Sequence, residues 1–252
     1  MSAPIPSELI DSVRHGETIV FCGAGLSAQA GLPTGVQLAH GLSDRIDGFD
    51  GNKDDLVEVS TTYSAMRGRH ALLTFLLGRV NDDRLPPTAA HLALCGLPFT
   101  AYVSTNWDHL IERALHVHRI RHRTLVTDSE LPFLQSAEVP VIKLHGTLAR
   151  PDTIVVTDKD YYDLFAVRPG LASLVDGYFA TKTLLFIGYA LNDPDFKRIF
   201  YTCTRRFGPL RRRAYAVQRG VAAATIQVWR EEHVDVIDQD ALSFSRDLAA
   251  AV

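Results

Sequence analysis

Cysteine is scarce in this chain and its distribution excludes some site types. Only Cys22, Cys95 and Cys203 occur in 252 residues, and no C-x-x-C pair is present. Structural zinc sites usually need such pairs, so this pattern argues against one. The odd count and the wide spacing also indicate a reducing compartment rather than a disulfide framework.

Long hydrophobic runs are missing as well. No apolar stretch approaches the roughly 18 residues that a membrane span needs, and the first residues lack the charged-then-apolar pattern of a secretory signal. We therefore expect a soluble, cytoplasmic protein with no membrane partner.

An excess of positive charge is also absent. The chain carries 26 basic and 29 acidic residues, for a net charge of −3, so nothing attracts it globally to nucleic acid. The one local exception is the arginine cluster at 205, 206 and 211–213. A solvated helix end and loop is favoured over a nucleic-acid or partner patch, and we predict no direct nucleic-acid binding.

A glycine loop after a strand is the most informative stretch that is present. The β-branched and aromatic run at 18–22 enters Gly23-Ala24-Gly25, and small residues follow as far as Gly31. Gly25 lets backbone N–H groups approach a pyrophosphate, and Ala28 stands where a dinucleotide loop has its third glycine. The same pattern also occurs in turns that bind nothing.

Two common nucleotide-binding patterns do not fit this loop. No Gly-Lys-Ser/Thr follows, which argues against a P-loop, and no second strand ends in an acidic residue about 20 positions on, as a dehydrogenase would need. A dinucleotide bound here is therefore held differently.

Strands and helices alternate along the chain. We predict strands at 18–22, 99–104, 124–126, 140–144, 154–156, 183–187, 213–217 and 234–237, with helices between most of them. Such alternation predicts a Rossmann-like parallel α/β sheet with helices on both faces. The length of the chain suits a single domain over 1–252. Because so much helix separates the first two strands, we predict an inserted helical module over 38–98.

Polar residues follow several of these strands directly. Gly23, Asn106, His145 and Gly188 each stand just past a strand end. Ligands of parallel sheets bind outside the carboxyl ends of the strands, so the four positions together predict one site.

The chain resembles the sirtuin family, and within it the zinc-free, NAD-hydrolysing branch of bacterial antiviral-defence effectors. The resemblance covers nearly the whole length, and its motifs are Gly23-Ala24-Gly25-Leu26-Ser27 with Gly31-Leu32-Pro33, Thr105-Asn106-Trp107-Asp108, Lys143-Leu144-His145-Gly146, and Gly188-Tyr189-Ala190-Leu191-Asn192-Asp193-Pro194.

The resemblance implies NAD as substrate, no metal, and a role for each matching residue. By this resemblance the catalytic residues are His145, Asn106 and Asp108. It implies that NAD is bound by Gly23, Ala24, Gly25, Ser27, Gly31, Pro33, Thr105, Gly188, Tyr189 and Asn192. A structural histidine, a helix-capping Asn106 and a first-turn Asp108 are the simpler alternatives for three of these. Whether Trp107 belongs to the core or to the pocket stays open.

The chain departs from the deacylase pattern in one decisive respect. No cysteine occurs between Thr147 and Asp163, where zinc-binding sirtuins carry two C-x-x-C pairs, so we expect no zinc ribbon. Thr34-Gly35 also follows Pro33 where deacylases commonly have Phe-Arg. These departures put an acyl-lysine groove in doubt and leave the dinucleotide site intact.

The residue types suit cleavage of the nicotinamide–ribose bond. An amide such as that of Asn106 orients a water or a ribose hydroxyl, and His145 accepts a proton near neutral pH. We expect an NAD glycohydrolase, controlled by homo-oligomer formation or by a separate sensor protein. A protein deacylase or ADP-ribosyltransferase, and a non-catalytic module that binds NAD or ADP-ribose, are the alternatives.

Overall fold

The computed structural model describes residues 5–204 and 212–252, and a parallel sheet forms its centre. Its seven strands lie in the order β3-β4-β2-β1-β5-β6-β7, and every neighbouring pair is parallel. The strands are β1 (Thr18–Cys22), β2 (Ala101–Ser104), β3 (His122–Leu125), β4 (Val139–Lys143), β5 (Thr183–Ile187), β6 (Ala214–Val217) and β7 (Val234–Ile237). This arrangement confirms the predicted fold class.

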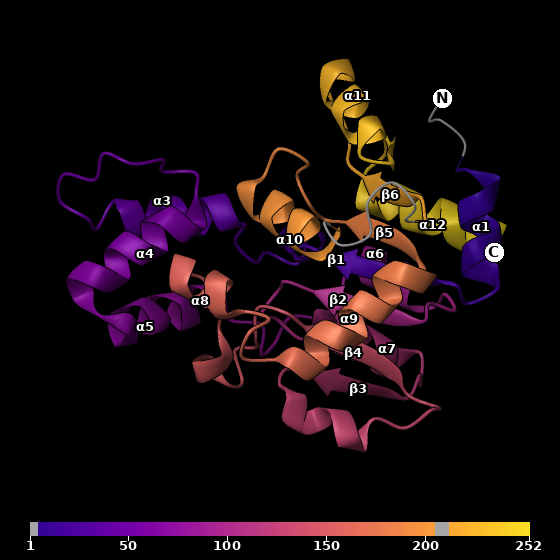
Figure 1. The fold of residues 1–252 in the computed structure, drawn as a ribbon, viewed down its shortest axis with the longest axis horizontal. Coiled ribbons are helices and arrows are strands. Elements are labelled where there is room, and N and C mark those ends of the chain that lie inside the picture. Colours follow the sequence, from indigo (N-terminus) through magenta and orange to yellow (C-terminus); the bar gives the residue numbers. More distant parts are fainter. Residues whose placement is uncertain (1–4, 205–211) are drawn as a thin grey trace.

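Helices cover both faces of the sheet (Figure 1). One face packs against α8 (Asp158–Asp163), α9 (Pro169–Thr181), α10 (Pro194–Thr204) and α11 (Ala223–Glu231). The other face packs against α1 (Ser7–Arg14), α2 (Ala24–Ala28), α6 (Ala89–Cys95), α7 (Leu110–Val117) and α12 (Ala241–Ala251). Alternate residues of β1 supply the two cores, with Ile19 and Phe21 on one side and Val20 and Cys22 on the other. The central strands β1 and β5 are buried along their whole length because both faces are covered.

A third hydrophobic cluster lies beside the sheet. It joins α3 (Gly35–Ser43), α4 (Leu56–Arg67) and α5 (Arg69–Arg79) to Trp107 and to the 154–156 segment. In Figure 1 these three helices form a group at one end of the molecule, next to α8. The helix α6 packs instead on α12 and α7, over the sheet. The division of the chain at 38–98 stays a prediction.

The structure corrects the prediction of a strand at 154–156. Residues 154–156 are not a strand but follow a 3₁₀ turn, η2 (Pro151–Thr153), and their apolar side chains are buried in two of the clusters. Gly68, whose φ is +86°, ends α4 and separates it from α5. A second 3₁₀ turn, η1 (Asp128–Phe133), follows β3. In the described part of the chain, no helix is long and apolar enough to cross a membrane.

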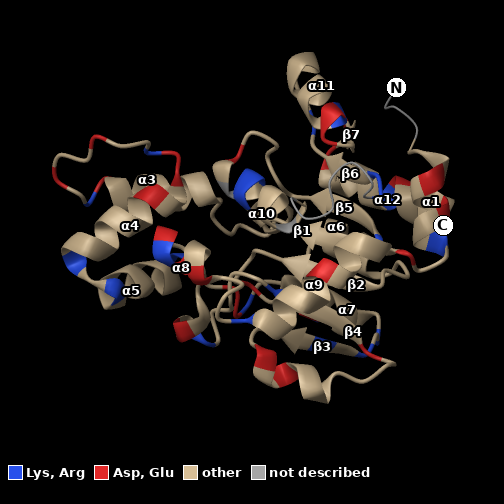
Figure 2. Cartoon of the chain, in the orientation of Figure 1, with Lys and Arg blue, Asp and Glu red and all other residues tan. Residues whose placement is uncertain are grey.

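Charged side chains are interspersed over the described part of the molecule. Figure 2 shows Lys and Arg scattered among Asp and Glu along the ribbon. Of the arginine cluster, residues 205–211 lie outside the described residues, while Arg212 pairs with Glu17 and Arg213 pairs with Asp235. These two arginines lie at the surface, as expected for a solvated loop.

Candidate active site

One cavity lies along the carboxyl edge of the sheet, where parallel folds bind ligands. Its volume is about 530 Å³, within the range of small-molecule sites. Ten of the predicted site residues line it: Ala24, Gly25, Ser27, Pro33, Thr105, Asn106, Asp108, His145, Gly188 and Tyr189. Gly23, Gly31 and Asn192 are not among the residues that line it. Helices α3 and α4 close one side through Val36 and Leu56.

The glycines after β1 and β5 are required because two backbones touch there. The Gly25 N–H donates to the Gly188 carbonyl oxygen at 2.8 Å. A Cβ on Gly188, whose φ is +80°, would stand 2.6 Å from the Gly23 carbonyl oxygen and the Leu26 nitrogen. The glycine loop after β1 is therefore held against the end of β5 by a hydrogen bond and by close backbone packing.

Asn106 is held against the glycine loop by its side chain. Its Nδ2 donates to the Gly23 carbonyl oxygen at 3.0 Å and to the Ser27 Oγ at 3.1 Å. Because α7 begins only at Leu110, Asn106 is not the cap of that helix. The amide instead joins the ends of β2 and β1 inside the cavity.

Asp108 lies two residues before α7, so it is not the first-turn acid that was the simpler alternative for it. Its Oδ1 accepts from the Leu110 N–H at 3.0 Å, which supports the start of α7. The same side chain is buried and lines the cavity. One carboxylate thus both supports the start of α7 and lies at the cavity wall.

Thr105 and Tyr189 meet between the strand ends. The two hydroxyl oxygens are 3.1 Å apart, and the Tyr189 hydroxyl also lies 3.1 Å from the Cys22 carbonyl oxygen as its donor. These contacts fix the Tyr189 ring at the wall of the cavity beside the glycine loop.

His145 stands after β4 in a tightly built turn. Gly146, with φ +81°, follows it, and a Cβ there would meet the Thr153 carbonyl oxygen at 2.2 Å. Arg168 donates to the Leu144 and Thr153 carbonyl oxygens at 3.0 and 2.9 Å. The Tyr161 ring packs edge-on, with centroids 5.0 Å apart. The turn is therefore fixed from several elements.

The imidazole of His145 is neutral at physiological pH. Burial, with a smaller effect from the Arg168 charge, lowers the pKa of His145 to about 3. Its Nε2 is buried and has no hydrogen-bond partner among the described residues. A neutral ring offers an acceptor nitrogen to a ligand in the cavity.

Unpaired buried polar atoms gather at this cavity. The His145 Nε2, the Trp107 Nε1 and the Gln239 Oε1 lack partners in the described chain, and all three residues line it. Buried polar atoms are normally hydrogen-bonded, and each exception needs an explanation. A polar ligand would supply the missing partners. Trp107 is thus both a member of the third hydrophobic cluster and part of the cavity wall.

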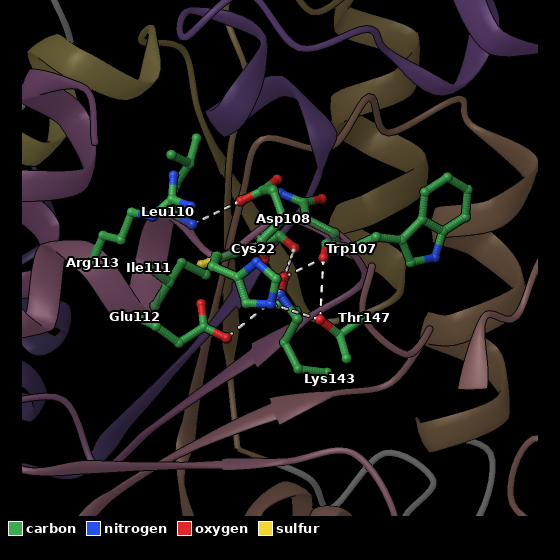
Figure 3. Close-up of polar contacts among 12 residues, drawn as sticks. Cys22, Trp107, Asp108, Leu110, Ile111, Glu112, Arg113, Lys143 and Thr147 are labelled. Carbon is green, nitrogen blue, oxygen red and sulfur yellow. Dashed lines mark hydrogen bonds and ion pairs between the residues drawn. The ribbon is translucent and has the colours of Figure 1, made fainter. Parts of the chain in front are cut away.

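A buried lysine supports the turn that carries Asn106 and Asp108. Lys143 is fully buried, donates from Nζ to the Asp108 carbonyl oxygen, and lies 3.8 Å from the Glu112 Oε1. Figure 3 shows its side chain among Asp108, Glu112 and Thr147, with the Trp107 ring pointing away. Lys143 therefore ties β4 to the loop after β2.

Sequence reasoning missed the β6 and β7 side of the cavity. Gln218, Arg219, Gln239 and Asp240 line it there. Each follows a strand within a few residues, which is the rule that found the other positions, so this signal was available. Among the described residues no group of three or more His, Cys, Asp or Glu side chains is placed to hold a metal ion.

Comparisons with known proteins agree with this fold. Residues 100–237 match the family model described as a SIR2-like domain. A crystal structure of a SIR2 homologue–NAD complex superposes with a TM-score of 0.63 at 15% identity, covering 99% of this chain and 94% of that one. A Sir2 homologue variant in complex with ADP-ribose gives a TM-score of 0.61 at 15% identity, with 98% and 96% covered.

Curated relatives are similar in sequence over most of this chain. A protein of Acinetobacter baumannii named NAD(+) hydrolase ThsA is 29% identical over 219 residues, covering 86% of this chain and 45% of that protein. Its namesake from Bacillus cereus is 28% identical, with 81% and 44% covered. Defense-associated sirtuin 2 of Bacillus subtilis is 24% identical, with 74% and 19% covered. The chain thus spans less than half the length of these relatives.

Proposed function

The chain belongs to the SIR2-like domain family, and on that premise we propose that it is an NAD hydrolase that releases nicotinamide and ADP-ribose. One observation carries the proposal: a single cavity joins the Gly25–Gly188 contact to Asn106 and His145. The names of the relatives, NAD(+) hydrolase, support the same reaction. In this role NAD is the substrate, and no metal takes part in the steps described below.

The bound dinucleotide would lie across the strand ends. The pyrophosphate would lie at the glycine loop, bound by Gly23, Ala24, Gly25 and Ser27, where small residues leave room for its oxygens. The nicotinamide ribose would lie between Asn106 and His145. We propose that the remaining predicted contacts to NAD come from Gly31, Pro33, Thr105, Gly188, Tyr189 and Asn192. Of all the predicted contacts, Gly23, Gly31 and Asn192 do not line the cavity.

The reaction breaks one bond and forms one. The C1′–nitrogen bond of the ribose breaks, nicotinamide leaves with the electron pair, and positive charge develops on the sugar. A water oxygen then bonds to C1′, and its proton passes to the neutral His145 ring and from there to solvent. Asn106 orients the water or a ribose hydroxyl, and the Asp108 carboxylate offsets the developing charge. Helices α3 and α4 close one side of the cavity and so limit the access of bulk water to the sugar.

Control of the activity belongs to the same proposal. This chain matches less than half the length of the relatives, and a defence effector that consumes NAD must stay inactive until needed. We propose a cytoplasmic antiviral-defence role in which homo-oligomer formation or a separate sensor protein activates the domain. NAD consumption measured over a concentration series tests this, since activation by assembly predicts a rate per chain that rises with concentration.

Product analysis tests the reaction itself. The purified chain is incubated with NAD alone, and nicotinamide and ADP-ribose are quantified by liquid chromatography. Equal amounts of both products support the hydrolase. Turnover that requires an acylated peptide would indicate a deacylase, and transfer of ADP-ribose to protein would indicate a transferase. Binding of NAD without turnover at any chain concentration would indicate a non-catalytic module.

A further inference from the structure

One imidazole joins three segments of the chain beside the cavity. The His109 N–H donates to the Asp82 Oδ2 at 2.6 Å, and the ring Nδ1 of His109 lies 3.1 Å from the same oxygen. The other ring nitrogen, Nε2, lies 2.8 Å from the Thr147 Oγ1. Asp82 follows α5, His109 follows β2 and Thr147 follows β4. We call these three residues the His109 bridge.

Each of the three segments also carries a residue of the cavity wall. These wall residues are Val80, Asp108 and His145. They precede the three residues of the bridge by two, one and two positions along the sequence. The bridge therefore fixes three parts of the cavity wall relative to one another.

Asp82 determines which ring nitrogen of His109 carries the proton. Its side chain is only 3% exposed, and the Arg113 Nη2 lies 3.5 Å from its Oδ2. Burial opposes ionisation of this carboxyl group, but the hydrogen bonds from His109 outweigh it and lower the pKa of Asp82 to about 2. An ionised carboxylate only accepts hydrogen bonds, so the proton stands on Nδ1. In the neutral ring Nε2 is then an acceptor, and the Thr147 hydroxyl donates to it.

The Thr147 hydroxyl ties the turn after β4 to the loop after β2. The two segments also meet through their backbones, since the Leu148 N–H donates to the Trp107 carbonyl oxygen at 3.2 Å. Figure 3 shows the Thr147 side chain close to this carbonyl group, at 3.5 Å from Oγ1. That distance is long for a hydroxyl donor, whereas 2.8 Å to the His109 ring is ideal. The hydroxyl is therefore committed to the imidazole.

A carboxylate, an imidazole and a hydroxyl in this order also form nucleophilic triads, but here the hydroxyl does not reach a substrate. Thr147 is only 4% exposed, and neither Thr147 nor His109 lines the main cavity. A nucleophile must contact the reacting atom of its substrate. The His109 bridge therefore acts on the reaction through the residues that it positions.

We propose that His109 is a positioning residue, which acts through Thr147 to hold His145 at the distance from the loop after β2 that the reaction needs. A displacement of about 1 Å in a catalytic constellation can lower the rate about 100-fold. The inference rests on the proposed function, because nicotinamide release is the reaction that this distance serves.

Valine and serine at position 147 separate the hydroxyl from the shape of the side chain. Thr147→Val keeps the volume and removes the donor, so kcat for nicotinamide release should fall by about tenfold or more, with little change in KM for NAD. Thr147→Ser keeps the hydroxyl and should restore the wild-type kcat. Thr74→Val is the matched control, because this exposed hydroxyl of α5 donates to the His70 carbonyl oxygen within its own helix. It should keep the wild-type rate.

A double variant shows whether His109 acts through Thr147. Asparagine at 109 can still donate to Asp82 but is too short to reach Thr147, so His109→Asn breaks the same link from the other side. It carries the same prediction if the valine variant does not fold. The kcat of the double variant, His109→Asn with Thr147→Val, should equal that of either single variant. Losses that multiply would show two independent effects and overturn the inference.

Nuclear magnetic resonance of the ring nitrogens tests the bridge without turnover. It is recorded on the ligand-free full chain with isotope-labelled histidine at about pH 8, where an ordinary histidine is neutral. The His109 signals are those that His109→Asn removes, and they should report a proton on Nδ1. The His145 ring signals should shift in Thr147→Val and return to their wild-type positions in Thr147→Ser.

Three further results would overturn the inference. They are a His109 proton on Nε2, His145 signals that Thr147→Val leaves unchanged, and a wild-type kcat in Thr147→Val. Failure of the hydrolase proposal looks different. In that case the wild type releases no nicotinamide from NAD, while the ring signals still behave as expected for the bridge.

Discussion

At the scale of single residues, burial gives His145 properties that its type alone does not. The ring stands in a turn fixed by Arg168 and Tyr161, and its pKa of about 3 keeps it neutral throughout the physiological range. A histidine in water would be partly charged at pH 6.5. The protein thus presents a permanent acceptor nitrogen to the cavity.

This pKa predicts the pH dependence of the reaction. Because His145 gains its proton only near pH 3, kcat/KM for nicotinamide release should stay nearly constant between pH 5 and pH 8. Steady-state rates in overlapping buffers measure it. An acid limb with a midpoint near 6.5 would contradict the assignment of a buried, neutral His145 as the proton acceptor.

Asn106 is the second residue whose contacts make a clear prediction. Asn106→Ala removes the two hydrogen bonds to the glycine loop and the amide that orients the water, so kcat should fall by about 100-fold or more. Asn52→Ala, at an exposed loop asparagine, is the matched control and should retain the wild-type rate. A fully active Asn106→Ala enzyme would remove this residue from the mechanism.

At the scale of elements, the contact between the loops after β1 and β5 sets the shape of the site. Gly188 and Gly220 both have positive φ, at +80° and +70°, but only Gly188 has backbone atoms where a Cβ would go. The pair therefore separates conformational strain from steric overlap.

Alanine at each position measures the two effects. Gly220→Ala should cost about 1 kcal/mol of unfolding free energy, from strain alone. Gly188→Ala should cost at least about 2 kcal/mol more, because the loop must move away from β5. Urea denaturation monitored by circular dichroism gives both values. Equal losses of unfolding free energy in the two variants would show that the loops after β1 and β5 move apart easily.

Some elements of the fold could be predicted from the sequence, and others could not. The strand ends at Gly23, Asn106, His145 and Gly188 were predictable because apolar runs stop at polar residues there, and parallel strands share one edge. The 154–156 run was misread because its apolar residues are buried without entering the sheet. The lack of a hydrogen-bond partner at the Gln239 Oε1 could not be predicted from sequence. It depends on the orientation in which Asp247 holds the Gln239 amide.

At the scale of the whole molecule, buried histidines tie stability to pH. Burial lowers the pKa of His91 to about 4 and that of His145 to about 3. The unfolded chain, with histidine pKa near 6.5, binds more protons than the folded chain between those values and 6.5. The contribution of these two neutral, buried rings to the free energy of unfolding is thus fully present above about pH 6.5. It is lost as the pH falls toward 3–4.

His91→Gln isolates one share of this effect. Between pH 7 and pH 5 each histidine should remove about 2 kcal/mol of unfolding free energy, so the variant should lose about half as much as the wild type. Glutamine suits the site, because His91 is the third helix residue of a capping box with Thr88. Urea titrations at the two pH values measure the difference. Identical losses in both proteins would mean that His91 is protonated in the fold.

Nicotinamide release by His145→Ala is the most direct test of the proposed reaction. The variant is compared with the wild type and with His116→Ala, which changes an exposed histidine on α7, at equal chain concentration and with folding verified by circular dichroism. We predict that wild type and His116→Ala release nicotinamide at the same rate, and that His145→Ala is slower by about 100-fold or more. A His145→Ala protein that releases nicotinamide at the wild-type rate would contradict the assignment of this cavity as a hydrolase site.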